Sequence, residues 1–284
     1  MDTTALFHYL SIAFYLASAV LYLAALMRRS RNLSPYVTFV FFLGMAANGA
    51  AVIARTIDVQ HAPFHTRYEA YLVTGICTAL GFLIVYLAGG LFRNTRRNSI
   101  IGNSLGALTA IFMVFILYRT VTSDAYKSFL PPALQSVWFW PHVTVYLFGY
   151  GALFVAVCAS VLYIIMHLRR GDDAQKRQEF LSDLDQFTYR TMSIGFPFLT
   201  MGLVFGALWA EQAWGTYWGW DSKEVWSLIT WIVYLLYLHL RMQKAWRGQR
   251  SAWFLIIGAV AIFITFELIG ILPSSQTSLH KYTD

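Results

Sequence analysis

Long apolar runs alternate with short polar segments along the whole chain. Each run is about as long as a helix that crosses a bilayer, which needs roughly 20 residues. Backbone amides in lipid must find partners within their own segment, so these runs predict helices. Together they predict an all-α integral membrane protein, a polytopic bundle of about eight transmembrane helices. The runs cover residues 4–27, 37–57, 71–91, 101–118, 140–166, 191–211, 226–243 and 252–271.

Positive charge gathers in four of the connecting segments, which hold 15 of the 21 Lys and Arg residues. By the positive-inside rule these segments face the cytoplasm, which predicts an N-out, C-out topology. The net charge of +7 then calls for no nucleic-acid partner, because membrane insertion already accounts for it. The basic segments are residues 28–36, 92–99, 167–190 and 241–251, and the outer segments are 58–70, 119–139, 212–225 and 272–284.

Residues 1–284 are predicted to form a single integral membrane domain. The mixed charges of residues 168–190 are typical of a solvated connecting loop with some amphipathic helix. The first run is expected to be a retained helix rather than a signal peptide, because no charged region precedes it and it is too long. The short loops and the lack of a transit peptide favour a bacterial plasma (inner) membrane over a thylakoid membrane.

The two cysteines carry no redox or haem-attachment motif. Cys77 and Cys158 lie inside predicted helices and form neither CxxC nor CxxCH. The chain is therefore not expected to bind haem covalently or to exchange dithiols by itself. Both residues are best interpreted as small apolar packing residues.

Residues 209–226 form a tryptophan-rich segment on the predicted outer face, and residues 214–226 of it read WGTYWGWDSKEVW. Tryptophan gathers at membrane interfaces, so a simple interfacial belt is one interpretation. The number of rings and the glycines between them favour a slot for a flat apolar ligand, because glycine allows close backbone approach or a positive φ. The candidate binding residues are Trp214, Gly215, Trp218, Gly219, Trp220, Asp221 and Trp226.

Three charged residues stand where the seventh helix begins. Asp221 is either an N-cap or part of the site, and Ser222 could cap the helix instead. The roles of Lys223 and Glu224 stay open at this point, including pairing among the three charges.

The histidines decide which flat ligand is expected, because a flat apolar ligand held by two axial imidazoles would be haem. His142, which follows WFWP, and His280, in the last outer segment, lie on the same side as the tryptophans. His239 lies thirteen residues beyond Trp226, which places it roughly 20 Å deeper at about 1.5 Å per residue. An ionisable residue at that depth is a functional candidate. For each histidine the competing interpretation is a hydrogen-bonded polar residue near an interface, and two separate stations are predicted.

Residues 195–241 resemble the "WWD" signature of haem-handling proteins, in the form WGxYWxWDxKExWSLITW followed by YLHLR. This form resembles the CcsA (ResC) family of system II cytochrome c biogenesis more than the related CcmC. RYEA at residues 67–70 is similar to the family's YE segment, and the tail around His280 resembles the family's C-terminal ending.

The resemblance implies specific roles for the histidines. His142 and His280 would be axial ligands of the haem iron beside the WWD segment, and His239 would be the transmembrane histidine. A CcsB (ResB)-type membrane partner would supply the second transmembrane histidine. Lys223 would be available to meet a haem propionate.

The implied function is the export of haem b and its thioether attachment to the CxxCH motif of apocytochrome c, as part of a holocytochrome c synthase (haem lyase) complex. One alternative is a haem transporter or chaperone that hands haem to another protein. A second is an electron-transfer cytochrome b, which needs paired histidines at matched depth. A third is a protein without haem whose tryptophans form only a belt.

Overall fold

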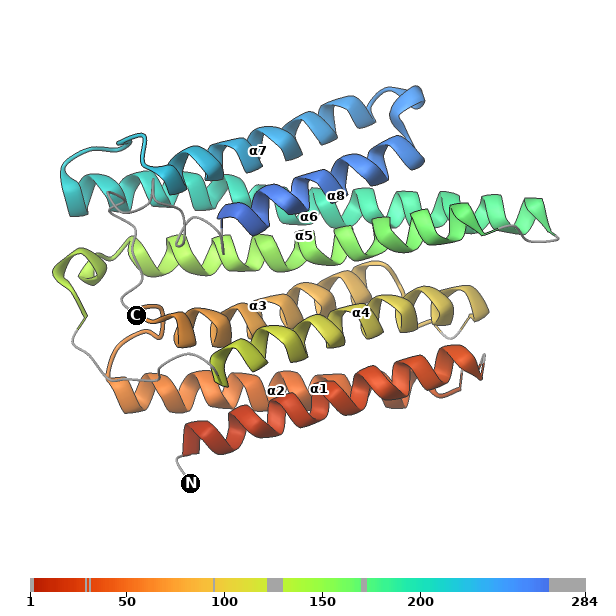
Figure 1. Cartoon of the computed structure of the whole chain (residues 1–284), viewed down its shortest axis with the longest axis horizontal. Helices are drawn as coiled ribbons and strands as arrows, with labels where there is room; N and C mark the ends of the chain where they lie inside the picture. Colours follow the sequence, from red (N-terminus) through yellow and green to blue (C-terminus); the bar gives the residue numbers. More distant parts are fainter. Residues whose placement is uncertain are drawn as a thin grey trace. The chain divides into compact units, whose positions relative to one another are not determined.

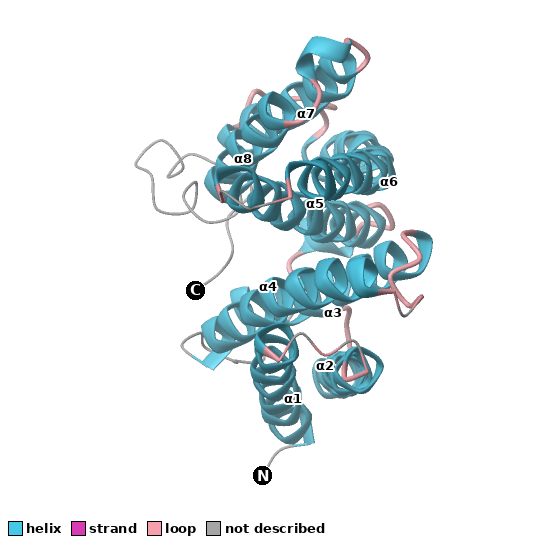
Figure 2. Cartoon of the chain, turned by 90° about the vertical axis from the view of Figure 1, so that its right-hand side faces the viewer, coloured by secondary structure: helices cyan, strands magenta, loops and turns pink. Residues whose placement is uncertain are grey.

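The computed structural model describes residues 3–28, 30, 32–93, 95–121, 130–169 and 173–265 of the 284-residue chain. Over these residues the protein is helical, and no strand occurs in this part of the chain (Figures 1 and 2). The eight expected helices are all present, and two short 3₁₀ turns join them. The elements are α1 Thr3–Met27, α2 Ser34–Val59, α3 Arg67–Ala88, α4 Arg96–Val121, η1 Pro132–Gln135, α5 Phe139–Leu168, α6 Ala174–Trp214, α7 Ser222–Arg241, η2 Lys244–Trp246 and α8 Gln249–Phe263.

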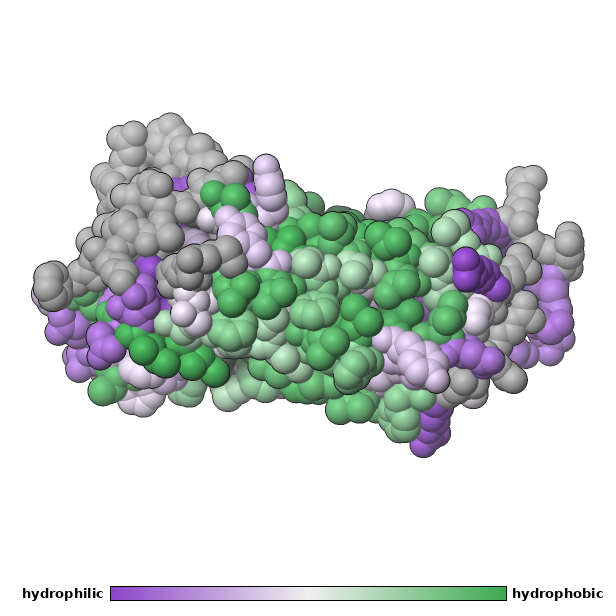
Figure 3. Space-filling view, turned by 90° about the horizontal axis from the view of Figure 1, so that it is seen from below, coloured by the Kyte–Doolittle hydropathy of each residue, from purple (hydrophilic) through white to green (hydrophobic). Residues whose placement is uncertain are grey.

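Six of the described helices, α1 to α6, are long and apolar enough to cross a membrane. The described part of α8 is a shorter apolar helix, and α7, which carries charged residues at both ends, is not among the six. Hydrophobic residues gather over the middle of the face drawn in Figure 3, and hydrophilic residues lie toward its ends. The all-α, polytopic membrane protein is thus confirmed, whereas N-out/C-out orientation stays a prediction.

The helices group into two compact units, α1–α4 in the first and η1 with α5–α8 in the second. Within each unit, consecutive helices run in alternate directions (Figure 1). One end of the second unit therefore collects the start of α5, the end of α6, the start of α7 and the end of α8. The single membrane domain proposed for residues 1–284 stays a prediction.

The first unit buries a charged pair near the junction of α2 and α3. Arg55 donates to Glu69 Oε1 at 2.9 Å, and both side chains are almost fully buried. The other Glu69 oxygen accepts from the backbone N–H groups of His65 and Thr66. Glu69 and Thr66 form a capping box that begins α3. Within the described residues, RYEA thus has a structural role in starting a helix.

Residues 168–190 were expected to form a connecting loop with some amphipathic helix; the loop part is wrong, because residues 174–190 are helical and begin α6. Asp173 caps the helix by accepting from the backbone N–H of Lys176 at 3.0 Å. Neither Gly nor Pro occurs between residues 174 and 194, so nothing interrupts the helix until Pro197, which lies inside it. A polar sequence forms a helix here because helix breakers are absent.

Glycines on α6 let α5 approach closely. A Cβ at Gly202 would clash with the ring of Tyr146, and a Cβ at Gly206 would lie 2.7 Å from His142 Cε1. The two glycines are one helical turn apart, the small-residue spacing that membrane helices use for close contact. This packing fixes where the α5 side chains stand.

Candidate functional site

His142 lies in the first turn of α5, against α6. Its Nδ1 is 2.8 Å from the carbonyl oxygen of Gly202. Because a carbonyl only accepts, Nδ1 must carry the proton, and the lone pair of the neutral ring is then on Nε2. Histidines that bind metals commonly have their other nitrogen held in this way. The hydrogen bond at Nδ1 therefore leaves Nε2 as the ring nitrogen that could bind a metal.

Aromatic rings hold the His142 ring on both sides. The ring stacks on Trp209 with centroids 5.6 Å apart and an interplanar angle of 22°. It meets Tyr146 edge-on at 5.4 Å. With Gly206 beneath it, the imidazole has little freedom to rotate.

The first half of the tryptophan segment belongs to the end of α6. Trp209 is buried, and its indole N–H donates to the carbonyl of Ala133 at 2.7 Å. The Trp214 ring lies 4.8 Å from the Trp209 ring. Gly215 then ends the helix with φ +77°, a left-handed conformation that glycine adopts without strain. Trp209 therefore packs against the His142 ring, and Trp214 packs against Trp209.

The second half of the segment is tied to the first turn of α7. Glu224 Oε2 accepts from Gly219 N at 2.8 Å and from Asp221 N at 3.0 Å. Asp221 caps α7 by accepting from Lys223 N at 2.7 Å, so the N-cap interpretation of Asp221 is confirmed. These hydrogen bonds hold the loop between α6 and α7 in place. Gly219 does not take the positive φ that glycine allows.

Trp220 takes the unusual backbone conformation in this loop. Its φ is +57°, although it is a bulky residue, and its side chain is 71% exposed. Such conformations cost energy and gather at functional sites. Its ring stands nearly perpendicular to that of Trp218, 5.9 Å away.

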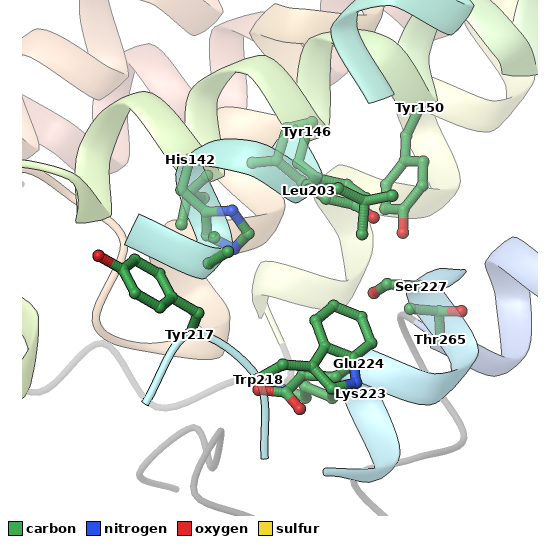
Figure 4. Close-up of a pocket in the computed structure, with 14 residues that line it drawn as sticks. His142, Tyr146, Tyr150, Leu203, Tyr217, Trp218, Lys223, Glu224, Ser227 and Thr265 are labelled. Carbon is green, nitrogen blue, oxygen red and sulfur yellow. The ribbon is translucent and has the colours of Figure 1, made fainter. Parts of the chain in front are cut away.

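A cavity of about 130 Å³ lies between α5, α6 and the loop that leads into α7 (Figure 4). His142 lines one side, and Trp218, Lys223 and Glu224 line the other. The indole Nε1 of Trp218 is buried and has no hydrogen-bond partner among the described residues. The cavity thus offers a nitrogen ligand, an aromatic face, an ammonium group and an unused N–H donor.

Several lining residues were not among the sequence candidates. Tyr146 and Tyr150 follow His142 at intervals of four along α5, and this spacing places all three on one helix face. Ser227 and Thr265 come from α7 and from the turn after α8. The four-residue spacing of the tyrosines was a readable signal, whereas the approach of Thr265 depends on tertiary packing.

Three of the candidate tryptophans, Trp214, Trp220 and Trp226, do not line this cavity. Trp226 is half-buried on α7. His280 lies outside the described residues, so its predicted place beside His142 stays a prediction. Among the described residues no group of three or more His, Cys, Asp or Glu side chains gathers as a metal-binding cluster.

His239 stands apart from this cavity. It lies in the last turn of α7, and its side chain is exposed. Ile229, Ile232 and Leu236 are exposed at helical spacing on the same helix, so His239 ends an apolar stripe. The structure therefore separates His239 from His142, and their roles as two haem stations stay a prediction.

The family model of "Cytochrome C assembly protein" matches residues 5–273 of the chain. The chain belongs to this family. It is a CcsA-type cytochrome c biogenesis protein, as the WWD segment suggested, and it functions in cytochrome c biogenesis.

Curated relatives support this membership. The chain is 31% identical to the cytochrome c biogenesis protein CcsA of Guillardia theta over 271 residues, which cover 86% of each chain. It is 28% identical to CcsA of Gloeobacter violaceus, with 95% of this chain and 93% of that one covered. Against CcsA of Chlamydomonas reinhardtii the identity is 31%, and the match covers 78% of this chain but 61% of that longer one.

A solved structure has the same fold. The chain superposes on the cytochrome c haem lyase CcmF with a TM-score of 0.67 at 19% identity. The match covers 93% of this chain and 46% of CcmF, so the chain spans about half of that protein.

Proposed function

We propose that this protein exports haem b across the membrane and presents it beside His142 and Trp218 for attachment to apocytochrome c. The observation that carries the proposal is the His142 imidazole. Its Nδ1 is held by the Gly202 carbonyl, so that Nε2 is the ligand nitrogen. Family membership supports haem as the ligand, since cytochrome c biogenesis requires it.

The cavity residues would bind and orient the macrocycle. His142 would ligate the iron, and Trp218 would lie against the ring system. Lys223 and the Trp218 N–H would suit a propionate, because the first is cationic and the second lacks an acceptor. The cavity, at about 130 Å³, is smaller than the ~300–1,000 Å³ of typical ligand pockets. Haem would therefore be enclosed only in part, with its vinyl edge open to the apocytochrome.

The attachment reaction itself needs little acid–base catalysis by the protein. Each cysteine S–H of the CxxCH motif adds across a vinyl C=C, forming one C–S and one C–H bond with no leaving group. Holding both reactants in register makes the encounter effectively unimolecular. The axial ligands would also influence the redox state of the iron. On this proposal the chain acts as part of a holocytochrome c synthase (haem lyase) complex.

The remaining residues would complete the path. His280 would be the second axial ligand at the outer station. His239 would take haem first, at the inner station, where a histidine from a CcsB (ResB)-type partner would face it. The exposed setting of His239 on α7 supports a ligand shared with another chain. We place the WWD segment on the outer face of a bacterial plasma membrane.

Absorption spectra of the purified chain, with and without its partner, test the outer station. We expect the haem absorption band of the wild type to fall by roughly tenfold in His142→Ala and in His280→Ala, because haem affinity depends on axial ligation. His167→Ala is the matched control, since His167 stacks on Tyr163 at the other end of α5. Full haem content in both outer-station variants would contradict the assignment.

A second assay separates attachment from delivery alone. The chain and its partner are supplied with haem and reduced apocytochrome c, and covalent haem is measured after denaturing electrophoresis. Covalent product from these components supports the haem lyase role. If haem leaves the chain but covalent product needs a further protein, the haem transporter or chaperone alternative holds.

A further inference from the structure

A second, larger cavity lies at the opposite end of the second unit from His142. Its volume is about 770 Å³, within the ~300–1,000 Å³ range of ligand pockets. The lining is mostly polar and comes largely from one face of the early part of α6. Gln178, Ser182, Asp185, Gln186 and Tyr189 recur on that face at intervals of three and four.

A partly buried ion pair is part of this cavity wall. Arg241, the last residue of α7, donates to both carboxylate oxygens of Asp185 at 2.8 and 2.6 Å. The same carboxylate accepts from Gly248 N at 2.9 Å, at the start of α8. Asp185 is thereby used to join α6, α7 and α8, and its charge is balanced by Arg241.

Two features leave this cavity suited to an anion. The side chain of Arg241 is only 8% exposed, and its Nε is buried and has no hydrogen-bond partner among the described residues. Arg247 also lines the cavity, and its side chain is exposed. With Asp185 balanced by Arg241, the lining keeps about one unit of positive charge, which matches a singly charged group.

We propose that this cavity binds the phosphodiester headgroup of an anionic phospholipid. The cavity lies where four membrane helices end, so its polar lining stands at headgroup depth rather than among acyl chains. Basic pockets between membrane helices recognise acidic lipid headgroups. Met242 lines the same cavity and is 76% exposed, which offers an apolar surface to an acyl chain.

This lipid site is separate from the inner haem station. His239 and Arg241 are two residues apart on α7, and their side chains differ in setting, since His239 is exposed and Arg241 is buried. The lipid proposal does not depend on the proposed haem function.

Native mass spectrometry of the full chain in detergent tests the site, with phosphatidylglycerol as the probe and phosphatidylcholine as the uncharged comparison. We expect wild type to retain phosphatidylglycerol about tenfold more strongly than phosphatidylcholine. Arg247→Gln should remove this preference. Arg250→Gln is the matched control, because Arg250 is an exposed arginine near the start of α8 that does not line the cavity.

A second variant tests the cavity without touching its charges. Ser182→Phe places a ring in the cavity from an exposed position, so the fold should survive while lipid retention falls. Equal retention of phosphatidylglycerol by wild type, Arg247→Gln and Ser182→Phe would overturn the proposal. So would displacement of the lipid by millimolar inorganic phosphate, which would identify a phosphate site, or by equimolar haem, which would assign the cavity to the haem path.

Discussion

At the scale of single residues, the site rests on how His142 is confined. Its ring is bounded by the Gly202 carbonyl, the Trp209 ring and the bare Cα of Gly206. A histidine fixed on three sides can present only one nitrogen to a ligand. Gly202, through its carbonyl oxygen, and Gly206, through its lack of a side chain, therefore fix the position of the imidazole.

Gly206→Ala tests this confinement. The new methyl group would lie 2.7 Å from His142 Cε1, so the imidazole must shift. Overpacking of this kind costs about 1–3 kcal/mol, and we expect haem binding to weaken by about tenfold in a titration followed by absorption. Gly49→Ala is the control, since its Cβ would lie 3.7 Å from Ile76 Cδ1, an ordinary van der Waals contact. Unchanged haem affinity in Gly206→Ala would show that close packing against Gly206 does not fix the His142 ring.

His65, just before α3, gives a pH-dependent prediction. Burial lowers the pKa of His65 and His61 lowers it further, while Glu69 opposes the shift. Because the folded-state pKa is below the unfolded one, the unfolded chain binds more protons between the two values. The contribution of His65 to the free energy of unfolding is therefore present above the unfolded pKa of about 6.5. It is lost as the pH falls through the lower, folded-state pKa.

We expect the Tm of the wild type in detergent to fall more steeply than the Tm of His65→Gln as the pH drops below about 6.5, the unfolded-state pKa of histidine. The variant should match the wild type above that pH if Gln fills the same place. Parallel Tm curves for the two proteins would contradict this assignment.

At the scale of elements, one side chain holds the loop before α7 against the first turn of that helix. The side chain of Glu224 closes the capping box with Asp221 and also holds Gly219 N. The sequence contained the evidence for part of this, since an acid three residues into a helix is a capping signal. The bond to Gly219 was not readable, because it depends on the path of the loop.

Glu224→Ala should remove the hydrogen bonds from Gly219 N and Asp221 N to the Glu224 carboxylate. Loss of a capping interaction costs about 0.5–2 kcal/mol, so we expect a lower Tm together with weaker haem binding, because Trp218 lies on the same loop. Glu211→Ala is the matched control, as Glu211 is exposed near the end of α6 and its backbone carbonyl bond to Gly215 remains. A lower Tm with unchanged haem binding would limit Glu224 to a structural role.

At the scale of the whole molecule, the eight helices were predictable because each apolar run is long and bounded by polar residues. The early part of α6 was predicted only as a loop with some amphipathic helix, since its polar residues suggested a loop and only the absence of helix breakers pointed to a continuous helix. Of the sequence candidates, His142 and Trp218 line the cavity and Gly215 takes a left-handed conformation, while their part in haem binding stays a prediction. Tyr146, Tyr150 and Thr265 were not among the candidates, because their place depends on which faces of α5, α6 and α8 meet.

The orientation of the chain in the membrane is predicted from charge alone, and it can be tested in intact cells. Both native cysteines, Cys77 and Cys158, are buried, so single cysteines introduced at exposed positions can be labelled without background. Thr216→Cys lies in the loop before α7 and Lys244→Cys in the segment after it, and both positions are exposed. If the basic segments face the cytoplasm, a membrane-impermeant maleimide should label Thr216→Cys in intact cells, and Lys244→Cys only after permeabilisation. The reverse pattern would place His142 and the WWD segment on the cytoplasmic side, where haem presented by His142 could not meet an exported apocytochrome. That outcome would leave haem binding possible but would remove attachment at this site.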